Sequence, residues 1–301
     1  MRTYQFIPLV FSIVISGMVA CSSAATLKAV QPAPIRPMIE NTKESGQTAS
    51  TTPETRSTPT RTTSTQYAVD FSNVHFILPT VVASGASGAT LPAEPYQEAM
   101  VCTGAPEHIS FKLMNYHGPE NSHFSPQIKI YPLEDFMEAS PCTSNPLNKL
   151  RTILNAQSVI SPMESILFPQ PPAAGVLLQI KKEIILFQKG RGIRLLTAYG
   201  QIRAPYTKGS ILYAFEGMTD DNRYFVQAFF PISAEILRTS VDLRTPEAGT
   251  FPPLSGSDGK PDYDATRYDA ALEKELEKLP ADKFTPSLVL LDEMIRSIQV
   301  K

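Results

Sequence analysis

Two pairs of apolar segments, each pair separated by a short polar turn, constrain the fold of this chain most strongly. The four segments are residues 183–187, 193–199, 211–215 and 224–230. The first pair flanks Lys-Gly-Arg-Gly at 189–192, whose glycines can adopt positive φ, and the second flanks Thr-Asp-Asp-Asn at 219–222. Because consecutive hairpins usually lie side by side, we expect both in one antiparallel sheet.

Aromatic side chains of the second hairpin fall on both faces of its strands. Such a hairpin is covered by the core on one side and by a helix, loop or partner on the other. The pattern favours core packing for these side chains. An exposed binding surface is the alternative, and its residues would be Tyr213, Phe215, Tyr224 and Phe225.

The remaining segments predict strands early in the domain and helices late. Further strands are expected at 67–78, 109–116 and 127–131, with a Gly-, Ala- and Ser-rich loop at 81–93. Helices are expected from Asn145-Pro146 onward, at 266–279, and from Thr285-Pro286 onward, where Leu288, Leu291, Ile295 and Ile298 form an apolar stripe. Residues 67–301 are therefore predicted to form a single α+β domain, with helices packed on one face of an antiparallel sheet.

The first residues have the layout of an export signal. Arg2 precedes an almost wholly apolar stretch, 6–19, which is too short to span a membrane comfortably. Small residues then precede Cys21, as in a bacterial lipobox, although Met18 stands where leucine is usual. We expect residues 1–20 to be removed and Cys21 to be lipidated. The alternatives are an ordinary signal cleaved after Ala25 and an uncleaved anchor.

A low-complexity stretch follows the signal. Residues 41–65 consist of Thr, Ser, Pro and scattered charges, with no aromatic residue. Such a composition cannot offset the entropy of ordering, so residues 21–66 are predicted to be a disordered tether. A spacer between membrane and domain is the favoured interpretation, with O-glycosylation as the alternative.

Three cysteines are present, Cys21, Cys102 and Cys142. Lipidation or removal of Cys21 leaves the other two as a pair, which outside the cytosol is a plausible disulfide. Closing a loop of about 40 residues stabilises a fold by up to about 4 kcal/mol on the chain-entropy account. Two free thiols are the alternative.

No constellation of reactive residues points to a reaction. His117, Glu120 and His123 could ligate zinc, but their spacing matches no familiar site, and Pro119 prevents a helix from aligning them. The acidic residues Asp258, Asp262 and Asp264 do not follow the spacing of an EF-hand loop. Neither a metal nor a cofactor is predicted. The chain carries 27 basic and 29 acidic residues without a basic run, so nucleic acid is not an expected partner.

The central hairpins contain two distinctive stretches, FQKGRGIRLLTAYGQ at 187–201 and LYAFEGMTDDNRYFVQAFFPI at 212–232. With these stretches the chain resembles a family of uncharacterised bacterial lipoproteins, and the export signal and PQIKIYPLEDF at 126–136 are more loosely similar to that family. It implies export and a lipid anchor, and it brings no catalytic residues.

These observations predict a non-enzymatic domain anchored by lipid on Cys21 to the extracytoplasmic side of a cell membrane. Its partner would be an unknown ligand, envelope component or protein. The alternatives are an envelope hydrolase with a dispersed active site, for which carboxylates and His117 or His123 would be candidates, and a purely structural envelope protein.

Overall fold

The computed structural model describes residues 65–97, 103–156, 174–242, 247–252, 254–255, 261–262 and 264–301. All of them belong to one compact unit, Pro34–Lys301. The predicted signal peptide, Cys21 and nearly all of the predicted tether lie outside the described residues, as do Cys102 and Asp258.

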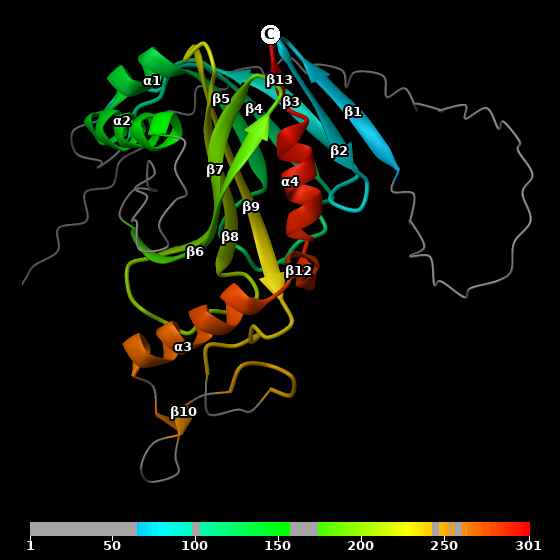
Figure 1. Cartoon of the computed structure of the whole chain (residues 1–301), viewed down its shortest axis with the longest axis vertical. Helices are drawn as coiled ribbons and strands as arrows, with labels where there is room; N and C mark the ends of the chain where they lie inside the picture. Colours follow the sequence, from blue (N-terminus) through cyan, green and yellow to red (C-terminus); the bar gives the residue numbers. More distant parts are fainter. Residues whose placement is uncertain are drawn as a thin grey trace, which may run out of the picture. The chain divides into compact units, whose positions relative to one another are not determined.

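An eight-stranded antiparallel sheet forms the centre of this unit (Figure 1). Its strand order is β3-β4-β5-β9-β8-β7-β6, and β12 pairs with β9 beside this path. The strands are β3 (Gly85–Leu91), β4 (His108–Met114), β5 (Gln127–Pro132), β6 (Gly175–Phe187), β7 (Gly190–Gly200), β8 (Ile211–Thr219), β9 (Tyr224–Ala234) and β12 (Phe284–Thr285). We call it the main sheet.

The two predicted hairpins are confirmed, and they are neighbours in the main sheet. β6 pairs with β7, β8 pairs with β9, and β7 pairs with β8. The first turn is shorter than expected, because β7 already begins at Gly190. A Cβ at Gly192 would lie 2.5 Å from the Glu216 carbonyl oxygen, so this glycine allows close packing between β7 and β8.

A smaller sheet of three strands lies beside the main sheet. It consists of β1 (Gln66–Phe71), β2 (Val74–Pro79) and β13 (Gln299–Val300), in the order β1-β2-β13. The single strand predicted at 67–78 is therefore wrong, because the chain reverses at Ser72, which adopts a φ of 55°. Two further short strands, β10 (Leu254–Ser255) and β11 (Pro261–Asp262), pair with each other.

The loop predicted at 81–93 is also wrong, since β3 occupies most of it. Small side chains give this segment a low intrinsic strand preference. The strand forms because its backbone pairs with β4 along its whole length, from Gly85 opposite Met114 to Leu91 opposite His108.

The described residues also form four α-helices and one 3₁₀ turn. They are α1 (Leu133–Ala139), α2 (Pro141–Ala156), α3 (Ala265–Lys278), the 3₁₀ turn η1 (Ala281–Lys283) and α4 (Leu288–Arg296). The expected start of α2 at Asn145 is wrong, because the helix begins at Pro141 and includes Pro146. α3 and α4 lie where the sequence predicts them, and α1 was not predicted.

Helices cover both faces of the main sheet rather than one. On β8, Tyr213 and Phe215 pack with α3, α4 and the smaller sheet, whereas the alternate residues Leu212 and Ala214 pack with α1 and α2. The predicted α+β class is confirmed. The sheet itself is buried on both sides, which explains why β8 and β9 are apolar at almost every position.

Candidate functional site

The aromatic residues of the β8–β9 hairpin belong to the core. Tyr213, Phe215 and Phe225 have no exposed surface, so the prediction of an exposed binding surface is wrong for them. The favoured interpretation, core packing, holds. Tyr224 is half-buried, and its hydroxyl accepts a hydrogen bond of 3.2 Å from Asn73 Nδ2.

The histidines weighed as zinc ligands lie in the connection between β4 and β5. His117, Glu120 and His123 are all exposed, and His117 Nδ1 lies 3.2 Å from the Val81 carbonyl oxygen. Within the described ranges, no three His, Cys, Asp or Glu side chains converge as metal ligands would.

Two of the three aspartates considered as ligands of an EF-hand type calcium site belong to secondary structure elements. Asp264 caps α3, because its side chain accepts a hydrogen bond of 3.0 Å from the Arg267 backbone N–H. Asp262 lies in the short strand β11. The third, Asp258, is outside the described residues.

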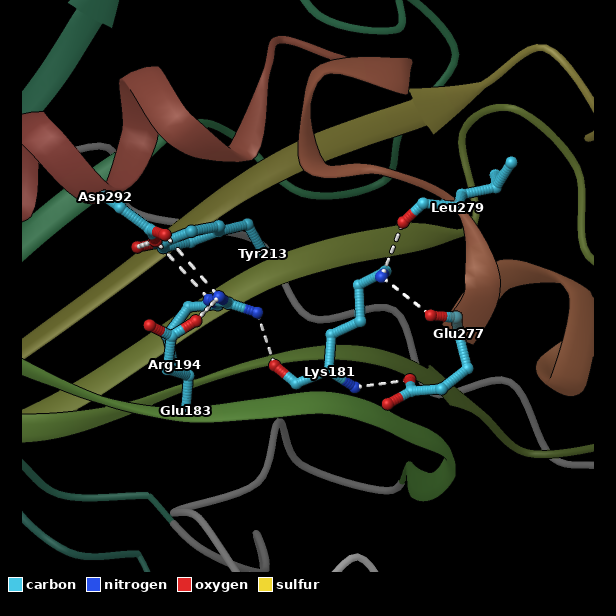
Figure 2. Close-up of polar contacts among 7 residues, drawn as sticks. All are labelled: Lys181, Glu183, Arg194, Tyr213, Glu277, Leu279 and Asp292. Atoms are coloured by element: carbon cyan, nitrogen blue, oxygen red, sulfur yellow. Dashed lines mark hydrogen bonds and ion pairs between the residues drawn. The ribbon is translucent and has the colours of Figure 1, made fainter.

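A buried ionic network joins the main sheet to α4 (Figure 2). Arg194 projects from β7, and its Nε lies 3.4 Å from Oδ1 of Asp292 on α4. The same carboxylate oxygen accepts a hydrogen bond of 2.8 Å from the Tyr213 hydroxyl. Arg194 also contacts the Glu183 carboxylate. Burial raises the pKa of Asp292, with the guanidinium of Arg194 acting in the opposite direction, and burial also raises the pKa of Tyr213 well above its usual value.

Lys181 extends this network to α3. It sits at an irregularity in the β6–β7 pairing with a φ of 51°, and Arg194 donates to its carbonyl oxygen. Its ammonium donates to the carbonyl oxygens of Glu277, at 2.9 Å, and Leu279, at 2.7 Å, at the end of α3. Because these groups bond mainly to one another, we assign the network a structural role: it fixes α3 and α4 on the sheet.

A polar row crosses the opposite face of the main sheet. Strand register places its members side by side from β4 to β8, and they are Ser110, Lys129, Gln227 and Glu216. Gln227 Nε2 donates a hydrogen bond of 2.9 Å to Glu216 Oε1. The second oxygen, Oε2, is buried and has no hydrogen-bond partner among the described residues.

Several side chains on this face have shifted pKa values. Burial raises the pKa of Glu216 well above its usual value. The pKa values of Tyr131 and Tyr199 are also raised, first by burial and then by the nearby Glu216. Burial lowers the pKa of Lys129. Such clusters occur at functional sites and in structural networks alike. Glu216 has no exposed surface, so the row offers a ligand no access to this carboxyl as the protein is folded here.

An open pocket of about 140 Å³ lies where the end of α2 meets the turns of the two hairpins. We call it the α2 pocket. Its lining consists of Arg151, Leu154, Asn155, Arg191, Met218, Thr219, Asp220 and Asn222. Leu154 and Met218 are almost fully buried, whereas the charged and amide side chains are partly or fully exposed. The surface of the pocket is therefore mainly polar, unlike the mostly apolar lining of a site for a drug-sized molecule.

The charged groups of the α2 pocket are only partly paired. Arg191 Nη2 lies 3.6 Å from Asp220 Oδ1, which is longer than a hydrogen bond. Arg151 Nη2 donates a hydrogen bond of 2.8 Å to Glu134 Oε1, whereas its Nε is buried without a hydrogen-bond partner among the described residues. These groups can hold a ligand by charge and hydrogen bonds.

Thr219 carries the single hydroxyl in the pocket lining, and this hydroxyl forms its hydrogen bonds within the β8–β9 turn. Its Oγ1 donates to Asp221 Oδ1 at 2.6 Å and accepts from the Tyr224 backbone N–H at 3.0 Å. Asp221 also accepts from the Arg223 backbone N–H at 3.0 Å, as expected for an aspartate in a turn. The hydroxyl therefore stabilises the conformation of the turn.

Sequence reasoning did not select Arg151 or Arg191 as site residues. They come from a helix and from a hairpin strand, 40 positions apart in sequence, and no local motif links them. Asp220 belongs to the polar turn predicted at 219–222, and it also lines the pocket. The sequence offered one indication of this pocket. Arg191 and Asp220 carry opposite charges, and they lie in the predicted turns of two hairpins that we expect to be adjacent.

The predicted disulfide involves Cys142, which is half-buried in α2. Cys102 is outside the described residues, so this pairing stays a prediction. The described helices include none with the length and apolar composition needed to cross a bilayer.

No protein-family model matches the chain, and no curated protein matches it either.

Proposed function

We propose that this chain is a lipid-anchored, extracytoplasmic domain that binds a ligand without converting it. The observation that carries the binding part is the α2 pocket, whose lining offers charged and amide groups. Its one hydroxyl donates to Asp221 and accepts from the Tyr224 backbone N–H, and hydrogen bonds from Thr219 and from the Arg223 backbone lower the pKa of Asp221. This carboxylate is therefore a weak base, whereas nucleophilic catalysis by the hydroxyl would need a stronger one.

The anchor part of the proposal rests on the order of segments in the sequence. An export signal ending at Cys21 is followed by a Thr-, Ser- and Pro-rich stretch, and the first described strand begins at Gln66. About 45 residues of coil reach roughly 40 Å, which would hold the domain away from a membrane surface. The order supports a tethered domain.

Lipidation is tested by comparing the full chain with a Cys21→Ser variant, both expressed in a bacterial host. We expect the wild type to carry a diacyl or triacyl modification on Cys21 and to partition into detergent. The variant should lack the modification and remain in the aqueous phase. An unmodified wild-type chain beginning after Ala25 would overturn the anchor.

Binding without conversion is tested with the full chain extracted from its own membranes in mild detergent. Native mass spectrometry identifies a co-purifying compound, which is then returned to the protein and followed over time. We expect the compound to be recovered unchanged. Its hydrolysis at a rate that scales with protein concentration would overturn the proposal in favour of the hydrolase.

A further inference from the structure

We propose that the α2 pocket is a binding site for a single oxyanion group, a carboxylate or phosphate, with Arg191 and Arg151 as its main contacts. This inference rests on the proposed binding function and names the chemistry of its ligand. A pocket of about 140 Å³ is smaller than the sites that enclose drug-sized molecules, and it suits a small anion or the charged end of a longer molecule.

Arg191 has donors to spare. Among the described residues its ion-pair partner is Asp220, and the separation of 3.6 Å is too long for a hydrogen bond. Its side chain is about one third exposed, so the guanidinium is reachable from solvent. A planar guanidinium with free donors is suited to bind an oxyanion through two parallel hydrogen bonds.

Arg151 is held in place before any ligand arrives. One nitrogen, Nη2, donates to Glu134 Oε1 at 2.8 Å and contacts Met137 Sδ at 3.5 Å. The Nε donor is buried without a hydrogen-bond partner among the described residues. An oriented cation loses little side-chain entropy on binding, which favours affinity.

The surface that a ligand would meet in the pocket is mainly polar, which suits a charged group. Leu154 and Met218 are 3% and 4% exposed, so they add little apolar surface. Asn155 and Asn222 add amide donors at the rim.

The balance of charge favours an anion over a cation. Two guanidinium groups line the pocket against one carboxylate, that of Asp220. Glu134, the partner of Arg151, is not part of the lining and is largely exposed, so its charge is well screened. A cationic ligand would face net repulsion.

The test is calorimetric titration of the full chain, in mild detergent, with inorganic phosphate, acetate, glycerol 3-phosphate and methylammonium. We expect saturable binding of at least one oxyanion and none of methylammonium. Arg191→Gln should weaken oxyanion binding by about tenfold or more, as expected for the loss of a charge-assisted contact. Binding of glycerol 3-phosphate as well as inorganic phosphate would show that the group is accepted on a longer molecule.

Arg223→Gln is the matched control. Arg223 lies in the neighbouring β8–β9 turn and carries the same charge as Arg191, but it does not line the pocket. We expect this variant to bind within about twofold of the wild type, because exposed charges outside the site are screened. Arg151→Gln gives an independent second variant if Arg191→Gln fails to fold.

Three results would overturn the inference. They are the absence of saturable oxyanion binding, an equal loss in the Arg191 and Arg223 variants, and preferential binding of methylammonium that Asp220→Asn abolishes. If oxyanions fail while a compound from native membranes is still bound and recovered unchanged, the ligand chemistry is wrong and the binding function stands. Conversion of that compound would instead overturn the binding function.

Discussion

Gln227 donates a hydrogen bond of 2.9 Å to Glu216 at the centre of the main sheet, and the other oxygen of this carboxyl is buried without a hydrogen-bond partner among the described residues. Glu216 has no exposed surface, and burial raises its pKa well above the usual value. The neutral form is therefore the one that the folded protein favours. This pair makes the stability of the sheet dependent on pH.

The sign of this dependence follows from the raised pKa. In the unfolded chain Glu216 ionises near its ordinary value of 4.5, whereas the folded protein resists ionisation. Its contribution to stability is therefore fully present below that pH and is lost as pH rises toward the folded-state pKa, by at most about 1.4 kcal/mol per pH unit. Glu216→Gln should remove this loss, so its advantage over the wild type should grow from pH 5 upward.

Urea unfolding of both proteins at a series of pH values measures that advantage. The control is Glu235→Gln, which removes an exposed carboxylate in the turn after β9. A constant difference between Glu216→Gln and the wild type across this range would contradict the raised pKa.

Removing Arg194 should be more damaging than removing the whole ion pair. Arg194→Met leaves Asp292 buried beside Tyr213 without its cation, and such a loss costs about 3–5 kcal/mol. Replacing Asp292 by Asn as well should restore part of the stability, because the uncompensated charge is gone. A double-mutant cycle from chemical denaturation gives the coupling, and strictly additive effects would show that the two side chains do not interact.

Lys181→Met should loosen the end of α3. The substitution keeps the backbone irregularity of β6 but deletes two hydrogen bonds, to the carbonyl oxygens of Glu277 and Leu279. Because Lys181 is only partly buried, we expect a loss of roughly 1 kcal/mol. Hydrogen exchange should quicken around Leu279, whereas Lys189→Met, in the exposed hairpin turn, should leave it unchanged.

If Cys102 and Cys142 form the predicted disulfide, replacing either cysteine by serine removes the same bond. Cys102→Ser, Cys142→Ser and the double variant should each lose the same stability, up to about 4 kcal/mol. The intact wild-type mass should also be lower by two hydrogens than after reduction. Unequal losses with no mass difference would favour free thiols.

The parts of the fold that sequence predicts are those with strong local apolar patterns. The continuous apolar runs of the β8–β9 hairpin specify strands buried on both faces. The apolar stripe of α4 from Leu288 to Ile298 specifies a helix and the face that it buries. β3 lacks such a signal, because its Gly, Ala and Ser residues are ordered by pairing with β4. The turn at Ser72 likewise depends on a φ of 55°, a backbone conformation that residues other than glycine adopt uncommonly.

The candidate site was less predictable than the fold. Arg151, Arg191 and Asp220 meet only because α2 packs against the face of the main sheet that presents the hairpin turns. Outside this site, the sequence did contain a signal within a single element, namely Glu216 within the apolar run of β8. An acidic residue in a strand buried on both faces already indicates a carboxyl that must stay neutral or find a partner.

The smaller sheet pairs β2, which is synthesised early in the domain, with β13, which is synthesised late. Lys301 donates from its backbone N–H to the Asn73 carbonyl oxygen at 2.9 Å, and Asn73 Nδ2 donates to the Lys301 carbonyl oxygen at 3.1 Å, across a separation of 228 residues. During synthesis, the β1–β2 hairpin therefore cannot pair with its third strand until residues 299–300 have been made. Until then the inner edge of β2 is exposed, and a chaperone that shields strand edges would act during this interval.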